Sequence, residues 1–161
     1  MPFQGIDLYG RVIGVNSRIE SPVRGSSGIG YAIPSNLVQA VIPQLIANGR
    51  AQYPWLGISG VEVTANNAGQ LGLPNEQRGI LISGLVSGGP ADTAGLRAAN
   101  AAGMGGDVIV AIDNKPISTF SDLVDHIVQY TAVGQTIQVH VLRNGQVQVI
   151  PLTLQARPSG N

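Results

Sequence analysis

The sequence of 161 residues contains no cysteine and only two histidines, His126 and His140. Without cysteine the chain has neither a disulfide framework nor a thiolate metal site, and two histidines are too few for a histidine cluster. We therefore expect no metal ion and no cofactor. The absence of cysteine leaves the redox compartment undecided.

The chain also lacks an excess of charge of either sign. Nine Lys and Arg residues balance nine Asp and Glu residues, and neither sign clusters along the sequence. The basic face that nucleic acid or an anionic membrane requires is therefore missing, and nucleic acid is excluded as a partner. No apolar run approaches the roughly 18 residues of a membrane span. The first residues have neither a basic start nor an apolar core, so no export signal is visible in this chain.

The composition is typical of a folded domain made of short elements. Apolar residues form 43% of the chain, which is enough for a buried core, and 22 glycines with 10 prolines mark frequent turns. Such a chain is long enough for one domain of about 100 to 150 residues plus an extension. The regular recurrence of Val, Ile and Leu between the turns favours a β-rich or mixed fold over disorder.

The first 50 residues predict two strands and a helix. The strands are expected at 9–19 and 28–33, with a turn-rich stretch at 20–27 between them. Ser35 or Asn36 is expected to cap a helix that closes near residues 48 and 49, and Pro43 is expected to kink or divide it. The short polar stretch 50–54 predicts a domain boundary.

Residues 55–157 predict a second set of elements. Pro90 is expected in the first turn of a short helix, and Thr119 with Asp122 forms a variant of the capping box at the start of a helix over 120–131. Asn144 and Gly145 predict a type I′ turn between two alternating strands. The full set is a loop and strand over 55–63, a short helix in 65–71, strands at 79–86, 107–112, 136–143 and 146–154, and a loop insertion at 100–106.

Three motifs together resemble the PDZ domains of the HtrA, or Deg, family of serine proteases. The segment Trp55-Leu56-Gly57-Ile58 is similar to a carboxylate-binding loop, in which the missing side chain of the glycine lets backbone N–H groups converge on an anion. The segments 89–96 and 106–117 resemble the Pro-Ala-x-x-Ala-Gly-Leu and Gly-Asp-x-Ile motifs of bacterial PDZ domains. The stretch 97–105 is longer than the usual join, which affects the local loop and not the fold.

The segments 8–16 and 28–34 resemble the last strands of an HtrA protease domain. The resemblance implies that residues 1–50 are the C-terminal remnant of a trypsin-like protease domain and that residues 54–157 form a PDZ domain. The expected fold is mixed α/β: a partly open antiparallel β-sandwich with two helices, preceded by a hairpin and helix from a truncated barrel. The nucleophile motif Gly-Asn-Ser-Gly-Gly of that family is missing, so we expect no catalytic residues and no enzymatic activity of this chain.

A peptide-binding groove is expected between the strand at 58–63 and the helix from Phe120. By resemblance, a peptide adds as a strand, its carboxylate meets backbone N–H groups, and its last side chain enters an apolar pocket. The assigned residues are Leu56, Gly57, Ile58, Ser59, Gly60, Val61, Leu123, Ile127 and Tyr130.

The helix from Phe120 presents a wide apolar stripe that two surfaces can share. We assign Val124 and Val128 to the core and His126 to the rim of the groove. The alternative, that the whole stripe belongs to the core, stays open. His140, on a strand, is interpreted as structural or solvent-facing.

The resemblance implies partners and a location. The expected partners are C-terminal peptides or unfolded substrates, and the protease domain of the parent protein, an extracytoplasmic endopeptidase of protein quality control. Two alternatives remain open: a regulatory or oligomerisation module that packs on its own protease domain, or a remnant of a catalytic domain. Unpaired strand edges in 9–33 also predict self-association.

Overall fold

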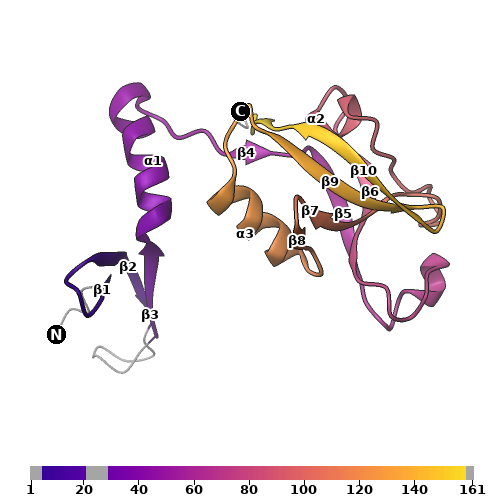
Figure 1. Ribbon diagram of the computed structural model, residues 1–161, viewed down its shortest axis with the longest axis horizontal. Helices are drawn as coiled ribbons and strands as arrows, with labels where there is room; N and C mark the ends of the chain where they lie inside the picture. Colours follow the sequence, from indigo (N-terminus) through magenta and orange to yellow (C-terminus); the bar gives the residue numbers. More distant parts are fainter. Residues whose placement is uncertain (1–4, 21–28, 159–161) are drawn as a thin grey trace. The chain divides into compact units, whose positions relative to one another are not determined.

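The computed structural model describes residues 5–20 and 29–158 (Figure 1). Contacts between Cα atoms divide the chain into an N-terminal unit, Met1–Gln52, and a C-terminal unit, Tyr53–Asn161. Each unit is described by itself. The turn predicted at 20–27 lies outside the described residues except for its first residue.

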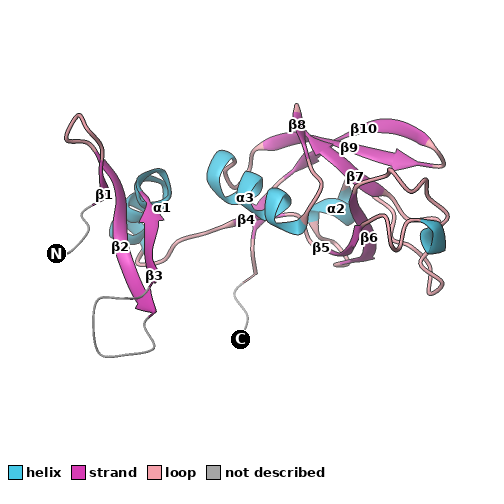
Figure 2. Ribbon diagram, turned by 90° about the horizontal axis from the view of Figure 1, so that it is seen from below, coloured by secondary structure: helices cyan, strands magenta, loops and turns pink. Residues whose placement is uncertain are grey.

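The N-terminal unit is a three-stranded antiparallel sheet with one helix. Its strands are β1 (Gly5–Ile6), β2 (Val12–Glu20) and β3 (Ile29–Pro34), in the order β1-β2-β3. Helix α1 (Ser35–Asn48) follows β3 directly and contacts β2 and β3 (Figure 2). The two predicted strands and the predicted helix are confirmed, and β1 is an additional strand that the sequence pattern did not indicate.

Two predicted details of helix α1 are wrong. Pro34 is the N-cap residue and makes no side-chain cap, so neither Ser35 nor Asn36 caps the helix. Pro43 lies inside one continuous helix, so the predicted division at this residue is wrong, whereas the alternative of a kink stays a prediction. The helix ends as predicted, because Gly49 adopts a φ of 68° and donates its N–H to the carbonyl of Leu45.

The C-terminal unit is a mixed α/β fold in which all strand pairs are antiparallel. The six-stranded sheet has the order β10-β9-β7-β6-β5, with β8 paired to β7, and β4 pairs with β11 in a separate small sheet. The strands are β4 (Pro54–Trp55), β5 (Ile58–Val63), β6 (Gly79–Leu85), β7 (Val108–Ile112), β8 (Lys115–Pro116), β9 (Thr136–Arg143), β10 (Gln146–Thr153) and β11 (Gln155–Ala156). The helices are the 3-10 helix η1 (Gly69–Leu71), α2 (Pro90–Thr93) and α3 (Phe120–Tyr130).

Local sequence signals explain several of these elements. Asn144 and Gly145 both have positive φ, at 52° and 76°, as the predicted type I′ turn between β9 and β10 requires. The capping box at α3 is also present, because the Thr119 hydroxyl accepts from the Asp122 N–H while the Asp122 carboxylate accepts from the Thr119 N–H. Pro90 occupies the first turn of α2.

The hydrophobic core fills both faces of the sheet. The larger cluster lies between the sheet and helices α2 and α3, and a smaller one forms around Val63, Ala68, Leu81 and Val108 on the other face. The expected partly open sandwich is therefore confirmed. The larger cluster comprises Leu56, Ile80, Ile82, Ala91, Leu96, Ile109, Ile112, Ile117, Leu123, Ile127, Ile137, Val139, Val141, Leu152 and Leu154.

The Gly-Asp motif at 106–107 holds a buried ion pair. The Asp107 carboxylate accepts from Nε and Nη2 of Arg143, each at 2.7 Å, and from the Arg97 N–H at 2.8 Å. A Cβ on Gly106 would lie 2.5 Å from the backbone nitrogen of Ala99, so only glycine fits there. Because the Asp107 N–H also donates to the Arg97 carbonyl, the insertion at 97–105 closes on itself and leaves the sheet intact.

Among the described residues, no helix is long and apolar enough to cross a membrane.

Candidate functional site

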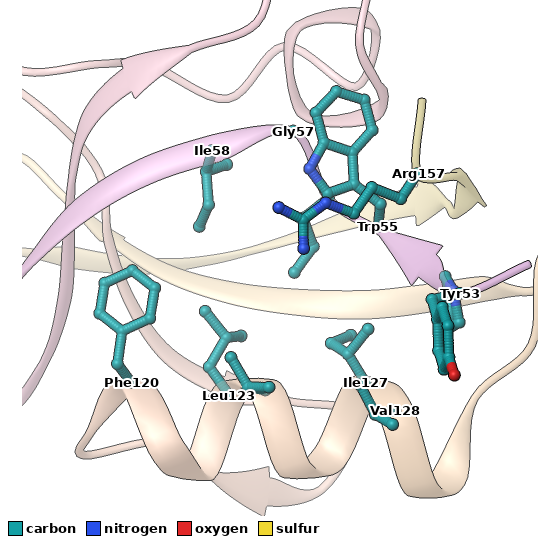
Figure 3. A pocket seen from close by; sticks show the side chains of 12 residues that line it. Tyr53, Trp55, Gly57, Ile58, Phe120, Leu123, Ile127, Val128 and Arg157 are labelled. Atoms are coloured by element: carbon teal, nitrogen blue, oxygen red, sulfur yellow. The ribbon is translucent and has the colours of Figure 1, made fainter. Parts of the chain in front are cut away.

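A cavity in the C-terminal unit lies between the start of β5 and helix α3, with a volume of about 320 Å³. Figure 3 shows Ile58 and Trp55 on one side and the apolar side chains of α3 on the other. The cavity is lined by Tyr53, Pro54, Trp55, Leu56, Gly57, Ile58, Phe120, Leu123, Val124, Ile127, Val128 and Arg157.

The loop at one end of the cavity presents free backbone donors. Gly57 has a φ of 79°, in the left-handed region, and a Cβ there would lie 3.3 Å from Pro90 and Trp55. The carbonyls of Leu56 and Gly57 accept from the N–H groups of Ala91 and Val86, each at 2.9 Å. Within the described part of the chain, the N–H groups of Leu56 and Gly57 have no acceptor. Free N–H groups on successive residues are suited to an anion.

Strand β5 provides an open edge next to this loop. It is the last strand of the sheet order, and its inner side pairs with β6 in the register Ile58↔Leu85 and Gly60↔Ile82. In residues 5–20 and 29–158 no strand pairs with its outer side. An edge of this kind can accept an additional strand.

Helix α3 is held against β5 by two contacts. The Glu62 carboxylate on β5 accepts the Phe120 N–H at 2.7 Å, across 58 residues of sequence. A Cβ on Gly60 would lie 2.7 Å from Ile80 and 3.5 Å from the Phe120 ring, so the glycine allows the ring to approach the strand. These contacts set the spacing between the two walls of the cavity.

The face of α3 that lines the cavity differs from the predicted one. Leu123 and Ile127 line it as predicted, and both also belong to the core. Val124 and Val128, assigned to the core, line the cavity, and Val124 is 50% exposed. Tyr130 does not line it and is 62% exposed. The prediction centred the groove face of the helix on Leu123. In the structure, the residues that line the cavity instead follow the i, i+3, i+4, i+7, i+8 spacing that starts at Phe120.

Tyr130 and His126 form a separate group on α3. Their rings stack with centroids 5.7 Å apart, and the Lys115 ammonium lies 5.3 Å from the Tyr130 ring. His126, predicted on the rim, is only 9% exposed, because the Tyr130 ring packs on it. Its Nε2 lies 3.7 Å from the Asp113 carboxylate, beyond hydrogen-bond distance.

The structure brings together five of the nine predicted site residues: Leu56, Gly57, Ile58, Leu123 and Ile127 all line the cavity. Ser59, Gly60 and Val61 lie further along β5 and do not line it.

Sequence reasoning did not assign Tyr53, Pro54, Trp55, Phe120 and Arg157 to the cavity, although all five line it. Phe120 could have been found from its helical spacing to Leu123, and Trp55 from its position directly before Leu56 in the predicted loop. Arg157 had no local signal, because the pairing of β11 with β4 brings it to the loop.

Comparison with known proteins identifies the family of this site. Residues 54–154 match the family model of the PDZ domain. The chain is 35% identical over 156 residues to the periplasmic pH-dependent serine endoprotease DegQ of Escherichia coli (strain K12), covering 97% of this chain and 32% of that protein. It is also 35% identical over 153 residues to a probable periplasmic serine endoprotease DegP-like of Brucella suis biovar 1, covering 95% and 28%.

A solved structure of the HtrA-type protease AlgW with decapeptide is similar as well. It shares 36% identity and a TM-score of 0.71, covering 94% of this chain and 44% of that one. The chain spans about a third of the length of the two curated relatives. Because the PDZ model matches more than half of the chain and its relatives are Deg and HtrA proteases, the chain belongs to the PDZ domain family, in the form that HtrA-type serine proteases carry.

Proposed function

We propose that the PDZ domain binds peptides that end in a free carboxylate after an apolar residue. The peptide adds as a strand to the outer edge of β5, and its carboxylate accepts from the N–H groups of Leu56 and Gly57. The observation that carries this proposal is the position of these two unpartnered donors at the mouth of an apolar cavity.

The cavity determines which last residue fits. The part of the cavity that Leu56, Ile58, Leu123 and Ile127 form is apolar, so a charged side chain placed among these four would lose its hydration. We expect Val, Leu, Ile, Ala or Phe at the C-terminal position. Ordering a flexible peptide offsets much of the burial and hydrogen-bond gain, so the affinity is about micromolar. The similar protease AlgW has been solved with a decapeptide and with a tripeptide, which supports a peptide as the ligand class.

The test uses matched peptides with an acid or an amide end, measured by fluorescence polarisation. The acid form binds and the amide form binds at least about tenfold more weakly, since amidation removes the charge that the N–H groups stabilise. Equal affinities for the two forms would contradict the proposal.

A groove variant tests the location of the peptide. Val124→Glu replaces an apolar side chain of the cavity wall by a carboxylate that repels that of the peptide, so affinity falls by about tenfold. Val149→Glu on β10 is the matched control, because Val149 is also 50% exposed and lies outside the cavity. An unaffected Val124→Glu variant would contradict the assignment of this groove.

Binding, not catalysis, is the activity that we assign to this chain. In the part of the chain that the structure describes, neither His126 nor His140 hydrogen-bonds a hydroxyl, as activation of a serine requires. Incubation with denatured casein is expected to give no cleavage, and turnover that persists through rigorous purification would refute this. Because the similar DegQ is a periplasmic serine endoprotease, we propose that the domain presents C-termini to a protease active site outside the cytoplasm.

The N-terminal unit favours a second role in assembly. Val12, Ile13, Val15 and Ile33 on its sheet are between 39% and 58% exposed. A sheet with such exposed apolar side chains pairs readily with other protein surfaces. We propose that residues 1–50 are the end of a trypsin-like protease domain and mediate packing on it or self-association. Sedimentation velocity over a range of concentrations tests this, and a strict monomer at high concentration would count against self-association.

A further inference from the structure

Arg157 is the only charged residue among the twelve that line the cavity. It directly follows β11, and its N–H donates to the Tyr53 carbonyl at 2.9 Å. Because Gln155 pairs with Trp55, the backbone of Arg157 lies next to the strand that leads into the Leu56-Gly57 loop. The pairing of β11 with β4 therefore holds the backbone of Arg157 in place.

The side chain of Arg157 extends into the cavity. Figure 3 shows it passing the Trp55 ring, with the guanidinium between the Gly57–Ile58 segment and helix α3. In the part of the chain that the structure describes, the guanidinium has no hydrogen-bond acceptor and no carboxylate within 4.0 Å. Arg143, in contrast, uses its donors on Asp107 and on the Gly95 carbonyl.

A free guanidinium at an apolar cavity next to two free backbone N–H groups is a site for an anion. Five N–H donors in a planar fork match the two oxygens of a carboxylate. The N–H groups of Leu56 and Gly57 approach that carboxylate from the loop, while Arg157 reaches it from the end of β11, past the Trp55 ring (Figure 3). A carboxylate has enough lone pairs to accept from all of them at once.

We infer that Arg157 binds the terminal carboxylate of the peptide and so determines its preference over an amide. This inference rests on the proposed function, because the carboxylate belongs to the ligand proposed above. The side chain is exposed, so its effect is modest and screened by salt.

The experiment compares the complete wild-type chain with Arg157→Gln, Arg157→Lys and Arg97→Gln. Each is titrated with one peptide in its acid and amide forms by fluorescence polarisation, at low and at high salt. Arg97 is the control, because it is exposed, carries the same charge and lies outside the cavity. Equal unfolding midpoints show that each variant is folded.

In Arg157→Gln we expect affinity for the acid peptide to fall by about fivefold at low salt and by less at high salt, with affinity for the amide unchanged. Arg157→Lys should keep part of the preference of the wild type for the acid peptide, and Arg97→Gln should keep all of it. An unchanged ratio of acid to amide affinity in Arg157→Gln would overturn the role of Arg157 while leaving the proposed function intact. No acid preference in the wild type would instead refute the proposed function.

Discussion

The buried ion pair between Asp107 and Arg143 supports a quantitative prediction of stability. Asp107 is fully buried, and the side chain of Arg143 is 12% exposed. The guanidinium donates twice to the carboxylate and once to the Gly95 carbonyl, so it joins the end of α2 to strands β7 and β9. The hydrogen bonds with Asp107 raise the pKa of Arg143, which stays charged throughout.

The substitution Asp107→Ala removes the carboxylate and leaves the cation without its partner. Breaking a buried pair in this way costs about 3–5 kcal/mol, because the remaining charge stays desolvated. The Arg97 N–H also loses its acceptor. Since a domain of this size has about 5–15 kcal/mol of total stability, the variant is expected to lose a large share of it.

Urea unfolding measures this loss directly. Trp55 is the only tryptophan and lies in the cavity of the PDZ domain, so its fluorescence reports on this unit. Asp125→Ala is the control, because Asp125 is exposed on α3, and a change below about 0.5 kcal/mol is expected. The double variant Asp107→Ala/Arg143→Ala should lose less than the sum of the two single variants. A loss below about 1 kcal/mol in Asp107→Ala, or strict additivity, would refute the reasoning.

Three further substitutions test the loop and helix α3. Gly57→Ala forces an alanine into the left-handed region, so the free energy of unfolding should fall by about 1–2 kcal/mol and peptide binding should weaken. A variant that keeps both its stability and its affinity would show that this backbone strain is absent. Leu123 is 2% exposed, so Leu123→Ala should lose about 2–5 kcal/mol in urea unfolding, and a change below about 1 kcal/mol would contradict its place in the core. The Asp122 carboxylate accepts hydrogen bonds from the N–H groups of Thr119 and Ser118, and these bonds lower its pKa below the usual 3.8. The ionised Asp122 carboxylate therefore stabilises the domain fully above about pH 3.8, and this contribution is lost as the pH falls through the lowered pKa of Asp122. The difference in melting temperature between wild type and Asp122→Ala should then become smaller in acid. A difference that does not change with pH would argue against this.

Leu123, predicted from the sequence to line the groove, is not the residue at which a glutamate tests peptide binding. Leu123 belongs to the core cluster, so a glutamate there would bury an unpaired charge and unfold the domain. The exposed neighbour Val124 provides the cleaner test of binding.

The sequence alone determined the elements whose signals are local. The Asn144-Gly145 turn, the capping box of Thr119 and Asp122, and the position of Pro90 in α2 each depend on residues within a few positions of one another. Their backbone preferences and short-range hydrogen bonds are the same in any fold that contains them. The resemblance to the HtrA PDZ domain added the arrangement of these elements.

Only the tertiary structure decided which side chains meet at the cavity. The apolar stripe of α3 is wide enough for a core and a groove, and the sheet that packs on it determines that Val124 lines the cavity while Tyr130 covers His126. Arg157 lies 100 residues from Gly57 in sequence, and the pairing of β11 with β4 places it beside the loop. Contacts between distant segments depend on how the strands pair, and the sequence near each residue carries no signal for that pairing.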